Sequence, residues 1–423
     1  MFYLRLAYER TQRLLQKYRD ARDATGSRLQ GGYFIAQFCR QRFGYLLRHL
    51  RARSYIRSVR MEVQASRPHD RPCLALKVTG GIGDYIVIAR YLRDLAREVE
   101  PFAFDIYCNN IEVAEWVFAA VPGFREAFTE FLFEDLMREY DIGLWIMQAI
   151  IVHRKTAAWH RLRASRRLCA ALQHIARFKP KIEPFIGRHP MMDNFLAQRA
   201  VYMNFTRSTF LQGMTGIPPE GDALDLAVDE SIFSATGLHP GRYITIQSGF
   251  DPGMVVRGIG SNTATKCYPR FAEVVRHIKS ELPDLTIVQV GAGATSTPIA
   301  GVDRSLVGET TIQQTAALLK HAAWHIDNEG GLVHLGRCFG TRSTVVFGPT
   351  PIDFFAYEGN VNIRPASCGG CWWITETWMA RCPRGHLAPL CTRQDPVAVA
   401  RATIDAICPH PARIVAASEA SSA

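Results

Sequence analysis

The 423-residue sequence lacks a long uninterrupted apolar segment. No stretch supplies the roughly 18 consecutive apolar residues that a membrane-spanning helix requires. The first twenty residues, MFYLRLAYERTQRLLQKYRD, alternate arginines with apolar residues and therefore lack the apolar centre of a signal peptide. With 48% hydrophobic and 21% charged residues, the composition is that of a soluble globular protein, and we expect a cytoplasmic location.

The glycine spacing of dinucleotide-binding proteins is also absent. The stretch GGIGD (80–84) does not fit the pattern G-x-G-x-x-G, and no acid follows at the distance expected for contact with a ribose. This argues against an NAD-dependent oxidoreductase.

Most of the chain carries no net charge, although the formal net charge of the whole protein is +11. Residues 1–72 hold sixteen of the 50 Lys and Arg but only five of the 39 Asp and Glu, so the rest carries 34 of each sign. A local basic segment argues against nucleic acid as a partner. Within it, residues 33–59 interleave aromatic and aliphatic residues with arginines, which predicts amphipathic helices. Helices in residues 1–60 either contact anionic lipid at the inner membrane face or pack on the body or on another copy, as in a homo-oligomer.

Apolar runs and helical patterns alternate after a proline-punctuated linker at 66–72. In the first half, three runs read as strands separated by amphipathic helices. These runs are CLALKV (73–78), FAFDIYC (102–108) and DIGLWI (141–146). Alternation of this kind predicts an α/β fold with a parallel sheet.

A second alternating series begins near residue 242, after a basic and helical stretch at 150–220 that interrupts the first. Two doubly wound, Rossmann-like halves follow from this pattern, with a ligand cleft at the carboxyl ends of their strands. We therefore expect four regions along the chain. They are a basic helical extension (1–72), an N-terminal Rossmann-like domain (73–235), a C-terminal Rossmann-like domain (236–395), and a final helix with a flexible tail (396–423).

Glycine-rich turns follow the strands of the second half. They contain Ser248 and Gly249, Gly291, Glu329 with Gly330 and Gly331, and Gly348 with Thr350. Backbone N–H groups at such turns, together with the N-terminus of the next helix, form a ready site for an anion. Structural uses are the alternatives: Glu329 can cap the helix, and His334, one turn inside it, can be a core histidine.

Lys266 precedes a helix that Pro269 signals, and it follows a polar loop. Its ammonium suits a pyrophosphate leaving group because it is a compact point charge. The alternative is a lysine that only contacts solvent.

The first half has a glycine-rich turn of its own, in LKVTGGIGDYIVIARYL (76–92), with Gly80, Gly81 and Gly83. Asp84 brings a negative charge to this turn, where it would repel a phosphate. Asp84 is therefore either a helix cap or a group with a chemical task of its own.

Four of the eleven cysteines are clustered in a C-x2-C-x10-C-x8-C pattern: Cys368, Cys371, Cys382 and Cys391. Two intervening residues let the first pair reach one ion, and four thiolates complete a tetrahedral structural site for zinc or iron. Disulfides or buried thiols are the alternatives. No cofactor is expected for catalysis.

Residues 242–395 resemble glycosyltransferase family 9, the ADP-heptose:lipopolysaccharide heptosyltransferases. The matching segments are TATKCYP, ETTIQQTAALLKHA and NEGGLVHLGRCFGTRSTVVFGPT, and GGIGDYIVIARYL extends the resemblance to about residue 73. Two positions depart from the family: Glu329 stands where Asp is usual, and Cys267 follows Lys266 where Trp is common. The cysteine cluster is similar to that of autotransporter-modifying heptosyltransferases with bound iron.

The resemblance implies a GT-B fold and metal-independent, inverting transfer of a sugar from a nucleotide donor, with ADP-heptose favoured. The acceptor is a hydroxyl of lipopolysaccharide core, a related glycolipid or a protein. Asp84 is the implied general base, on an acceptor-side loop with Gly80, Gly81 and Gly83, and Lys266 neutralises the diphosphate. The implied donor-binding residues are Ser248, Gly249, Lys266, Gly291, Glu329, Gly330, Gly331, His334, Gly348 and Thr350.

An inverting displacement needs a carboxylate on one face of the sugar and positive charge on the leaving side, which Asp84 and Lys266 supply. The alternative is a non-catalytic nucleotide-sugar-binding or assembly subunit on the same fold. The presence of both residues speaks against it.

Overall fold

The computed structural model describes residues 36, 40, 52–250, 265–375 and 377–408. The chain divides into two compact units, residues 1–67 and 68–423. In the first unit, helix α3 (Arg53–Ser66) has its buried residues Ile56, Val59 and Val63 at helical spacing. Most of the predicted basic extension, and the tail at 409–423, lie outside the described residues. None of the described helices has the length and apolarity needed to span a bilayer.

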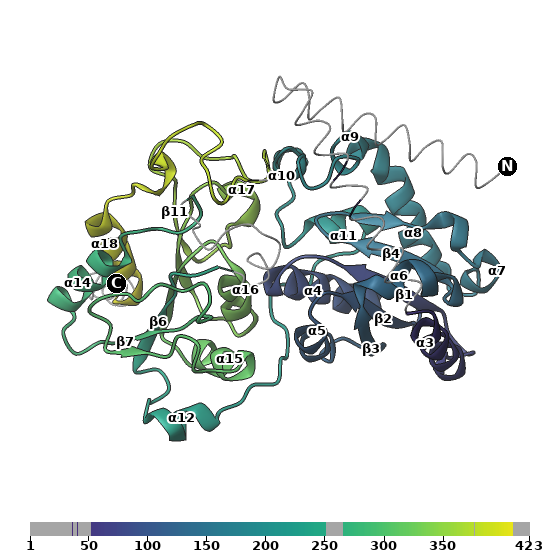
Figure 1. The fold of residues 1–423 in the computed structure, drawn as a ribbon, viewed down its shortest axis with the longest axis horizontal. Coiled ribbons are helices and arrows are strands. Elements are labelled where there is room, and N and C mark those ends of the chain that lie inside the picture. Colours follow the sequence, from purple (N-terminus) through teal and green to yellow (C-terminus); the bar gives the residue numbers. More distant parts are fainter. Residues whose placement is uncertain (1–35, 37–39, 41–51, 251–264, 376, 409–423) are drawn as a thin grey trace, which may run out of the picture. The chain divides into compact units, whose positions relative to one another are not determined.

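A five-stranded sheet organises the first half of the second unit (Figure 1). Its strands are β1 (Cys73–Val78), β2 (Ala103–Cys108), β3 (Phe124–Thr129), β4 (Ile142–Ile146) and β5 (Ile150–Val152). Their order is β3-β2-β1-β4-β5, and all pairs are parallel except β4 with β5. The chain turns from β1 toward β2 on one side and later adds β4 on the other. The carboxyl ends of β1 and β4 therefore mark the switch point at which such sheets bind ligands.

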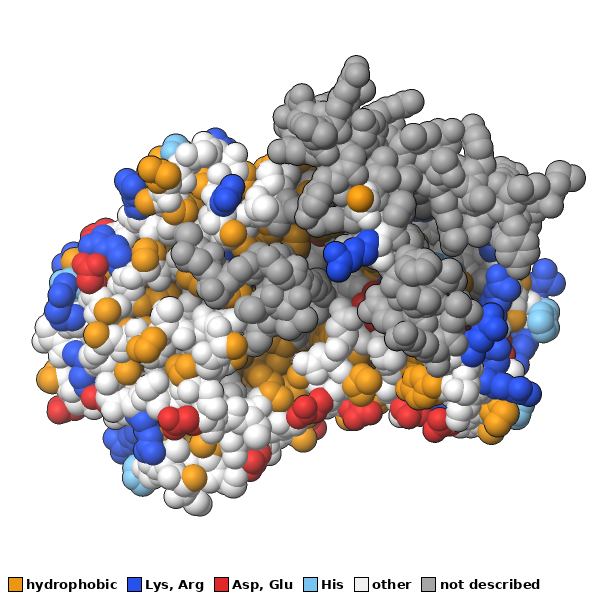
Figure 2. Space-filling model, in the orientation of Figure 1, with side chains coloured by type: hydrophobic (Ala, Val, Ile, Leu, Met, Phe, Trp, Pro, Cys, Tyr) orange, Lys and Arg blue, Asp and Glu red, His pale blue; other side chains and the backbone are white. Residues whose placement is uncertain are grey.

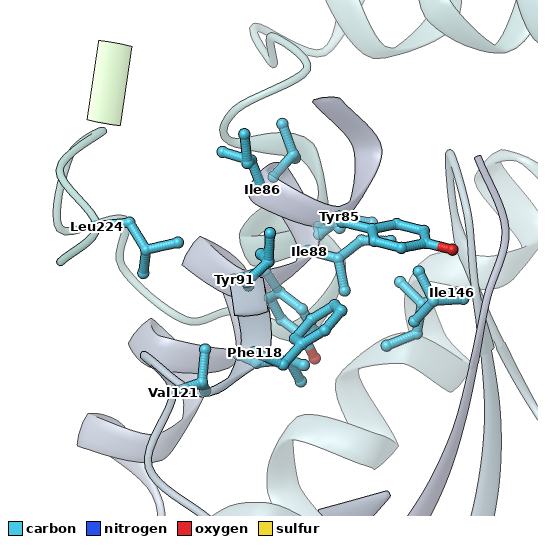
Figure 3. Close-up of a cluster of buried hydrophobic side chains, with 14 of the residues drawn as sticks. Tyr85, Ile86, Ile88, Tyr91, Phe118, Val121, Ile146 and Leu224 are labelled. Atoms are coloured by element: carbon cyan, nitrogen blue, oxygen red, sulfur yellow. The ribbon is translucent and has the colours of Figure 1, made fainter. Parts of the chain in front are cut away.

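Helix α4 (Ile82–Glu98) follows β1 directly and is deeply buried, with eleven buried residues among 17. Figure 3 shows Tyr85, Ile88 and Tyr91 of this helix in one cluster with Phe118 and Ile146. Each large apolar side chain buried in this way contributes roughly 1.5–3 kcal/mol, so the packing fixes the position of α4. Two further helices of this half are α5 (Ile111–Phe118) and α6 (Phe133–Leu136), and single 3-10 turns are η1 (Glu130–Leu132) and η2 (Met137–Glu139).

The stretch after β5 is helical, as its pattern predicts. It contains η3 (Arg154–Thr156), α7 (Trp159–Leu162), α8 (Arg166–Phe178), η4 (Lys179–Lys181), α9 (Glu183–Ile186), α10 (Asp193–Tyr202) and α11 (Phe210–Thr215). Helix α11 packs against both α8 and α4 and so joins this layer to the first half. Figure 2 shows Lys and Arg side chains at the end of the molecule where α7 lies.

A six-stranded, fully parallel sheet organises the second half. Its strands are β6 (Tyr243–Ile246), β7 (Thr286–Gln289), β8 (Arg304–Ser305), β9 (Trp324–Asn328), β10 (Ser343–Val346) and β11 (Val361–Ile363). The helices from residue 231 onward are α12 (Ser231–Thr236), α14 (Phe271–Glu281), α15 (Ile312–Lys320), α16 (Gly331–Cys338), α17 (Ile352–Phe355) and α18 (Pro396–Ile407), with a 3-10 turn η5 (Leu390–Thr392). Helix α18 packs on α14 and on β10 and β11.

The order of the second sheet is β11-β10-β9-β6-β7-β8. Both halves thus share one arrangement, in which the first strand lies between the second strand and the fourth. In the second half the switch point lies between β6 and β9. The prediction of two doubly wound, Rossmann-like halves is confirmed.

Helices α4 and α16 pack against each other and join the two halves. Leu332, Val333 and Leu335 of α16 belong to the same buried cluster as the apolar side chains of α4. Each of these helices begins directly after the central strand of a sheet. The N-termini of α4 and α16 therefore bring the two switch points together.

Candidate functional site

Asp84 lies in the first turn of α4, six residues after the end of β1. Its Oδ1 accepts hydrogen bonds from Arg207 Nη2 at 2.8 Å and Gln148 Nε2 at 3.1 Å. Among the described residues, its Oδ2 accepts only a longer bond, 3.3 Å, from the backbone N–H of Gly81. The carboxylate thus caps the start of α4, and Oδ2 keeps capacity for a further donor.

Gly80 makes room for this carboxylate. Its backbone has φ = +131°, and a Cβ added there would lie 2.1 Å from Asp84 Oδ2 and 2.5 Å from Asp84 Cγ. Only glycine avoids both the overlap and the backbone strain of this conformation. The glycine turn is therefore shaped around Asp84.

Arg207 and Gln148 hold the carboxylate from two other elements. Gln148 follows β4, the neighbour of β1 at the switch point. Arg207 follows α10; its backbone N–H donates to Phe354 O at 2.7 Å, and its side chain is 2% exposed. Sequence reasoning missed both residues, because Arg207 is one of many arginines in a basic stretch and pairs with Asp84 across 123 positions.

Lys266 and Glu329 form an ion pair at the second switch point. Lys266 Nζ lies 3.4 Å from Glu329 Oε2, and both side chains are largely buried. Burial alone lowers the pKa of Lys266, but nearby negative charge, first that of Glu329, outweighs it and leaves the pKa above its usual value. Lys266 is thus a charged lysine fixed by its ion pair, and not one that only contacts solvent.

Helix α16 begins beside this pair with Gly330 as its N-cap. Within the described part of the chain no side chain caps this N-terminus, and the first turn carries no acid. Glu329 therefore does not act as the cap, and it pairs with Lys266 instead. Unpaired backbone N–H groups with the positive end of a helix dipole form a site for an anionic oxygen.

The N-termini of α4 and α16 touch at Gly83 and Gly331. A Cβ on Gly83 would lie 2.6 Å from His334 Cδ2 and 3.3 Å from Gly331 Cα. Reciprocally, a Cβ on Gly331 would lie 2.5 Å from Ile82 Cγ2. At these two positions glycine admits the facing helix, and whether substrates also bind there stays a prediction.

His334 lies at this contact. The side chain is buried, and its Nδ1 lies 2.6 Å from the hydroxyl of Tyr357. Burial, with the positive charges of Arg90 and Arg207, holds the pKa of His334 well below its usual value. The imidazole is therefore neutral at pH 7.

The other predicted donor residues fall into two groups. In the first, Ser248, Gly249 and Gly291 belong to turns after β6 and β7 that are tied together. Ser248 Oγ donates to Thr297 O at 2.7 Å and accepts from Thr297 N, and a Cβ on either glycine would overlap Ser296. The Ser248 hydroxyl is thus already used within the protein.

The second group, Gly348 and Thr350, follows β10 and is buried. A Cβ on Gly348 would lie 3.4 Å from Thr265 O and 3.9 Å from Cys391 Sγ. Thr265, which precedes Lys266, donates through Oγ1 to Trp378 O at 2.6 Å and to Met379 O at 2.9 Å. The cysteine-rich segment therefore supports the backbone that carries Lys266.

The four clustered cysteines are free thiols, so the predicted alternative of disulfides is not what the structure shows. Burial first, then the neighbouring cysteines, raises the pKa of Cys371 to about 11 and that of Cys391 to about 12. For Cys391 these neighbours are Cys368, Cys371 and Cys382. Across the described ranges, however, no three or more Cys, His, Asp or Glu are arranged closely enough to hold an ion.

Two Rossmann-like domains whose switch points meet are those of the GT-B fold, and solved structures share it. One is a glycosyltransferase family 9 protein from Veillonella parvula, with 12% identity, a TM-score of 0.50, and coverage of 80% of this chain and 98% of that one. The iron-containing dodecameric glycosyltransferase TibC from enterotoxigenic E. coli has 15% identity, a TM-score of 0.50, and coverage of 81% and 80%. TibC in complex with ADP-D-β-D-heptose has 14% identity and a TM-score of 0.51, and the match covers 80% of this chain and 77% of that one.

Residues 244–366 match the model of glycosyltransferase family 9 (heptosyltransferase). This segment is similar to family 9, and the resemblance noted from the sequence is confirmed over this range. Asp84 and the four clustered cysteines lie outside the matched residues. No curated protein sequence matches the chain significantly.

Proposed function

We propose that the protein is an inverting glycosyltransferase that moves a heptose from ADP-heptose to an acceptor hydroxyl. The observation that carries the proposal is the meeting of Asp84, at one switch point, with Lys266 and the open N-terminus of α16 at the other. The matched family 9 domain supports the choice of reaction class. The complex of TibC with ADP-D-β-D-heptose supports the choice of donor.

In this mechanism Asp84 Oδ2 takes the proton of the acceptor hydroxyl as its oxygen attacks the anomeric carbon. Oδ2 suits this step because Arg207 and Gln148 occupy Oδ1 and fix the carboxylate. On the leaving side, Lys266 and the first amides of α16 stabilise the negative charge that develops on the diphosphate. Glu329 positions Lys266 and accepts hydrogen bonds from hydroxyls of the donor sugar. No metal ion takes part in these steps.

The acceptor belongs to lipopolysaccharide core, a related glycolipid or a protein, and the reaction takes place in the cytoplasm. The amphipathic pattern of the N-terminal segment supports peripheral contact with the inner membrane face if the acceptor is a lipid. Transfer of labelled sugar to purified core glycolipid and to serine-containing acceptor protein separates the two acceptors. Salt-dependent sedimentation with anionic vesicles tests the membrane contact.

Lys266→Ala is expected to abolish stabilisation of the protein by ADP and ADP-heptose. Ligand binding to the folded state at 100 times Kd adds about 2.7 kcal/mol of stability, which a thermal-shift assay detects. The matched control is Lys279→Ala, which removes an ion-paired lysine (Nζ to Asp303 Oδ1, 3.0 Å) away from the site. If another nucleotide diphosphate stabilises the wild type better than ADP, the donor is wrong. If no nucleotide diphosphate stabilises the wild type, the result favours the alternative of a non-catalytic subunit.

We further propose that Cys368, Cys371, Cys382 and Cys391 hold a structural zinc or iron ion. The proposal rests on the donor chemistry and spacing, four free thiols in a C-x2-C-x10-C-x8-C pattern, and on TibC, which is described as iron-containing. The described thiols would have to move closer together to hold the ion. The ion would supply a cross-link that fixes this segment and, through Thr265, the loop of Lys266. Because burial raises the pKa values of Cys371 and Cys391, binding must release protons, and the affinity is expected to fall as the pH falls.

Cys391→Ser is expected to lower the metal content measured by elemental analysis from about one ion per chain to near zero. It should also weaken stabilisation by ADP, since Thr265 loses its support. Cys408→Ser, which changes an exposed thiol, is the control. Equal metal content in the two variants would exclude the site.

A further inference from the structure

Three buried side chains from three elements form a hydrogen-bonded chain beside the proposed donor site. They are Arg90 on α4, Tyr357 after α17 and His334 on α16, with exposures of 1%, 5% and 6%. Arg90 Nη1 lies 2.8 Å from the Tyr357 hydroxyl, and that hydroxyl lies 2.6 Å from His334 Nδ1. The mechanism above uses none of the links between these residues.

The chemistry of the three groups fixes the direction of the hydrogen bonds. A guanidinium has only donors, so the Tyr357 oxygen must accept from Arg90. The hydroxyl hydrogen of Tyr357 then points to His334 Nδ1, which lies 2.6 Å from the hydroxyl oxygen. If Nδ1 donated instead, that hydrogen would remain buried without a partner, at a cost of about 1–3 kcal/mol. Nδ1 is therefore the acceptor, and the proton of the neutral imidazole lies on Nε2.

We propose that Tyr357 and Arg90 are positioning residues that hold His334 as the Nε2–H tautomer, so that Nε2–H donates to an anionic oxygen of the bound diphosphate. This inference rests on the proposed function. Nε2 is bonded to Cδ2, which faces Gly83 at the contact of α4 and α16. For Nε2 the described part of the chain supplies no hydrogen-bond partner. Its N–H is thus a donor left for a ligand.

Arg90 also controls the position of α16 itself. Its Nη2 donates to His334 O at 3.1 Å and to Cys338 Sγ at 3.3 Å. Arg90 and Asp84 lie on the same helix, so one rigid element carries the proposed base and orients the donor-side histidine. Arg90 of the acceptor-side half thus contacts both the backbone of His334 and the Tyr357 hydroxyl that meets its ring.

Tyr357→Phe tests this assignment without needing the reaction. In protein labelled with ¹⁵N-histidine, the two ring nitrogens report by NMR which one is protonated, and His334→Gln identifies the signal. We expect the wild type to carry the proton on Nε2 and Tyr357→Phe to show a mixture of both tautomers. Tyr243→Phe is the matched control, because it removes a buried hydroxyl on β6 that donates to Leu318 O on α15 at 2.7 Å. A wild-type signal with the proton on Nδ1 would overturn the inference.

ADP binding is the second measurement. We expect Tyr357→Phe to weaken the binding of ADP about tenfold, because an oriented hydrogen bond to a charged group is lost. Tyr243→Phe should leave the affinity for ADP unchanged. If the wild type binds ADP and Tyr357→Phe binds it equally well, the positioning role is wrong while the proposed function stands. If the wild type binds no ADP, the proposed donor fails, and the tautomer measurement still decides the role of Tyr357.

Discussion

Asp84→Asn is expected to lower kcat for sugar transfer about 10²–10⁴-fold and to leave ADP binding unchanged. Asparagine keeps the size of the side chain and one oxygen for the bonds from Arg207 and Gln148, but it cannot take a proton from the acceptor. Lys266 and the N-terminus of α16, which hold the diphosphate in the proposed mechanism, are untouched. The measurement is the rate of transfer from ADP-heptose, together with hydrolysis of the donor in the absence of acceptor.

Asp94→Asn is the matched control for this prediction. Asp94 lies on the same helix, is buried, and also accepts from an arginine and a glutamine: Arg93 Nη2 at 2.6 Å and Gln212 Nε2 at 2.8 Å. Its substitution should lower the melting temperature without a change in kcat for the folded enzyme. A kcat for Asp84→Asn within a few fold of the wild type would remove Asp84 as the base.

Gly80→Ala is expected to cost at least about 10²-fold in kcat although residue 80 contacts no substrate in the proposed mechanism. The new Cβ would overlap Asp84 Oδ2, so the carboxylate must turn away from the position that Arg207 and Gln148 define. Displacement of a reacting group by about 1 Å costs on the order of 10²-fold. Backbone strain at φ = +131° adds about 1–3 kcal/mol of instability.

Gly221→Ala separates overlap from strain. Gly221 also has a positive φ, +99°, but a Cβ there meets nothing within 4 Å. The melting temperature should fall in both variants, and kcat should fall only in Gly80→Ala. Stabilisation by ADP should survive in both. If the two variants keep equal kcat, the shape of the turn does not determine the position of Asp84.

The interior strands could be predicted from the sequence, and the edge strands could not. Strands β1, β2, β4, β6, β7, β9 and β10 are apolar runs, because helices cover both faces of a parallel sheet. Sequence reasoning missed β3, β5, β8 and β11, and these are the four edges of the two sheets. Edge strands are short or polar, and their pairing depends on a neighbour that local sequence does not reveal.

The candidate site divides in the same way. Asp84, Glu329 and His334 follow central strands closely, and Lys266 precedes the helix that Pro269 signals, so their positions could be predicted. Their partners could not. Arg90 lies 244 positions from the carbonyl of His334 that it contacts, and nothing in its surroundings on α4 distinguishes it from a solvated arginine. Such contacts depend on the tertiary fold and on no local pattern.

Gly83 and Gly331 also bear on which sugars fit. Here two buried helices meet at glycines, with the Ile82 and His334 side chains directly against them, so neither helix can yield without moving its whole sheet. The space between the proposed base and the diphosphate site then has a fixed length, and it selects donors by steric fit. A single methylene in a rigid site is worth about 1–3 kcal/mol. Glu329, one methylene longer than the Asp usual in family 9, would therefore shift the preference among sugars that differ by one carbon.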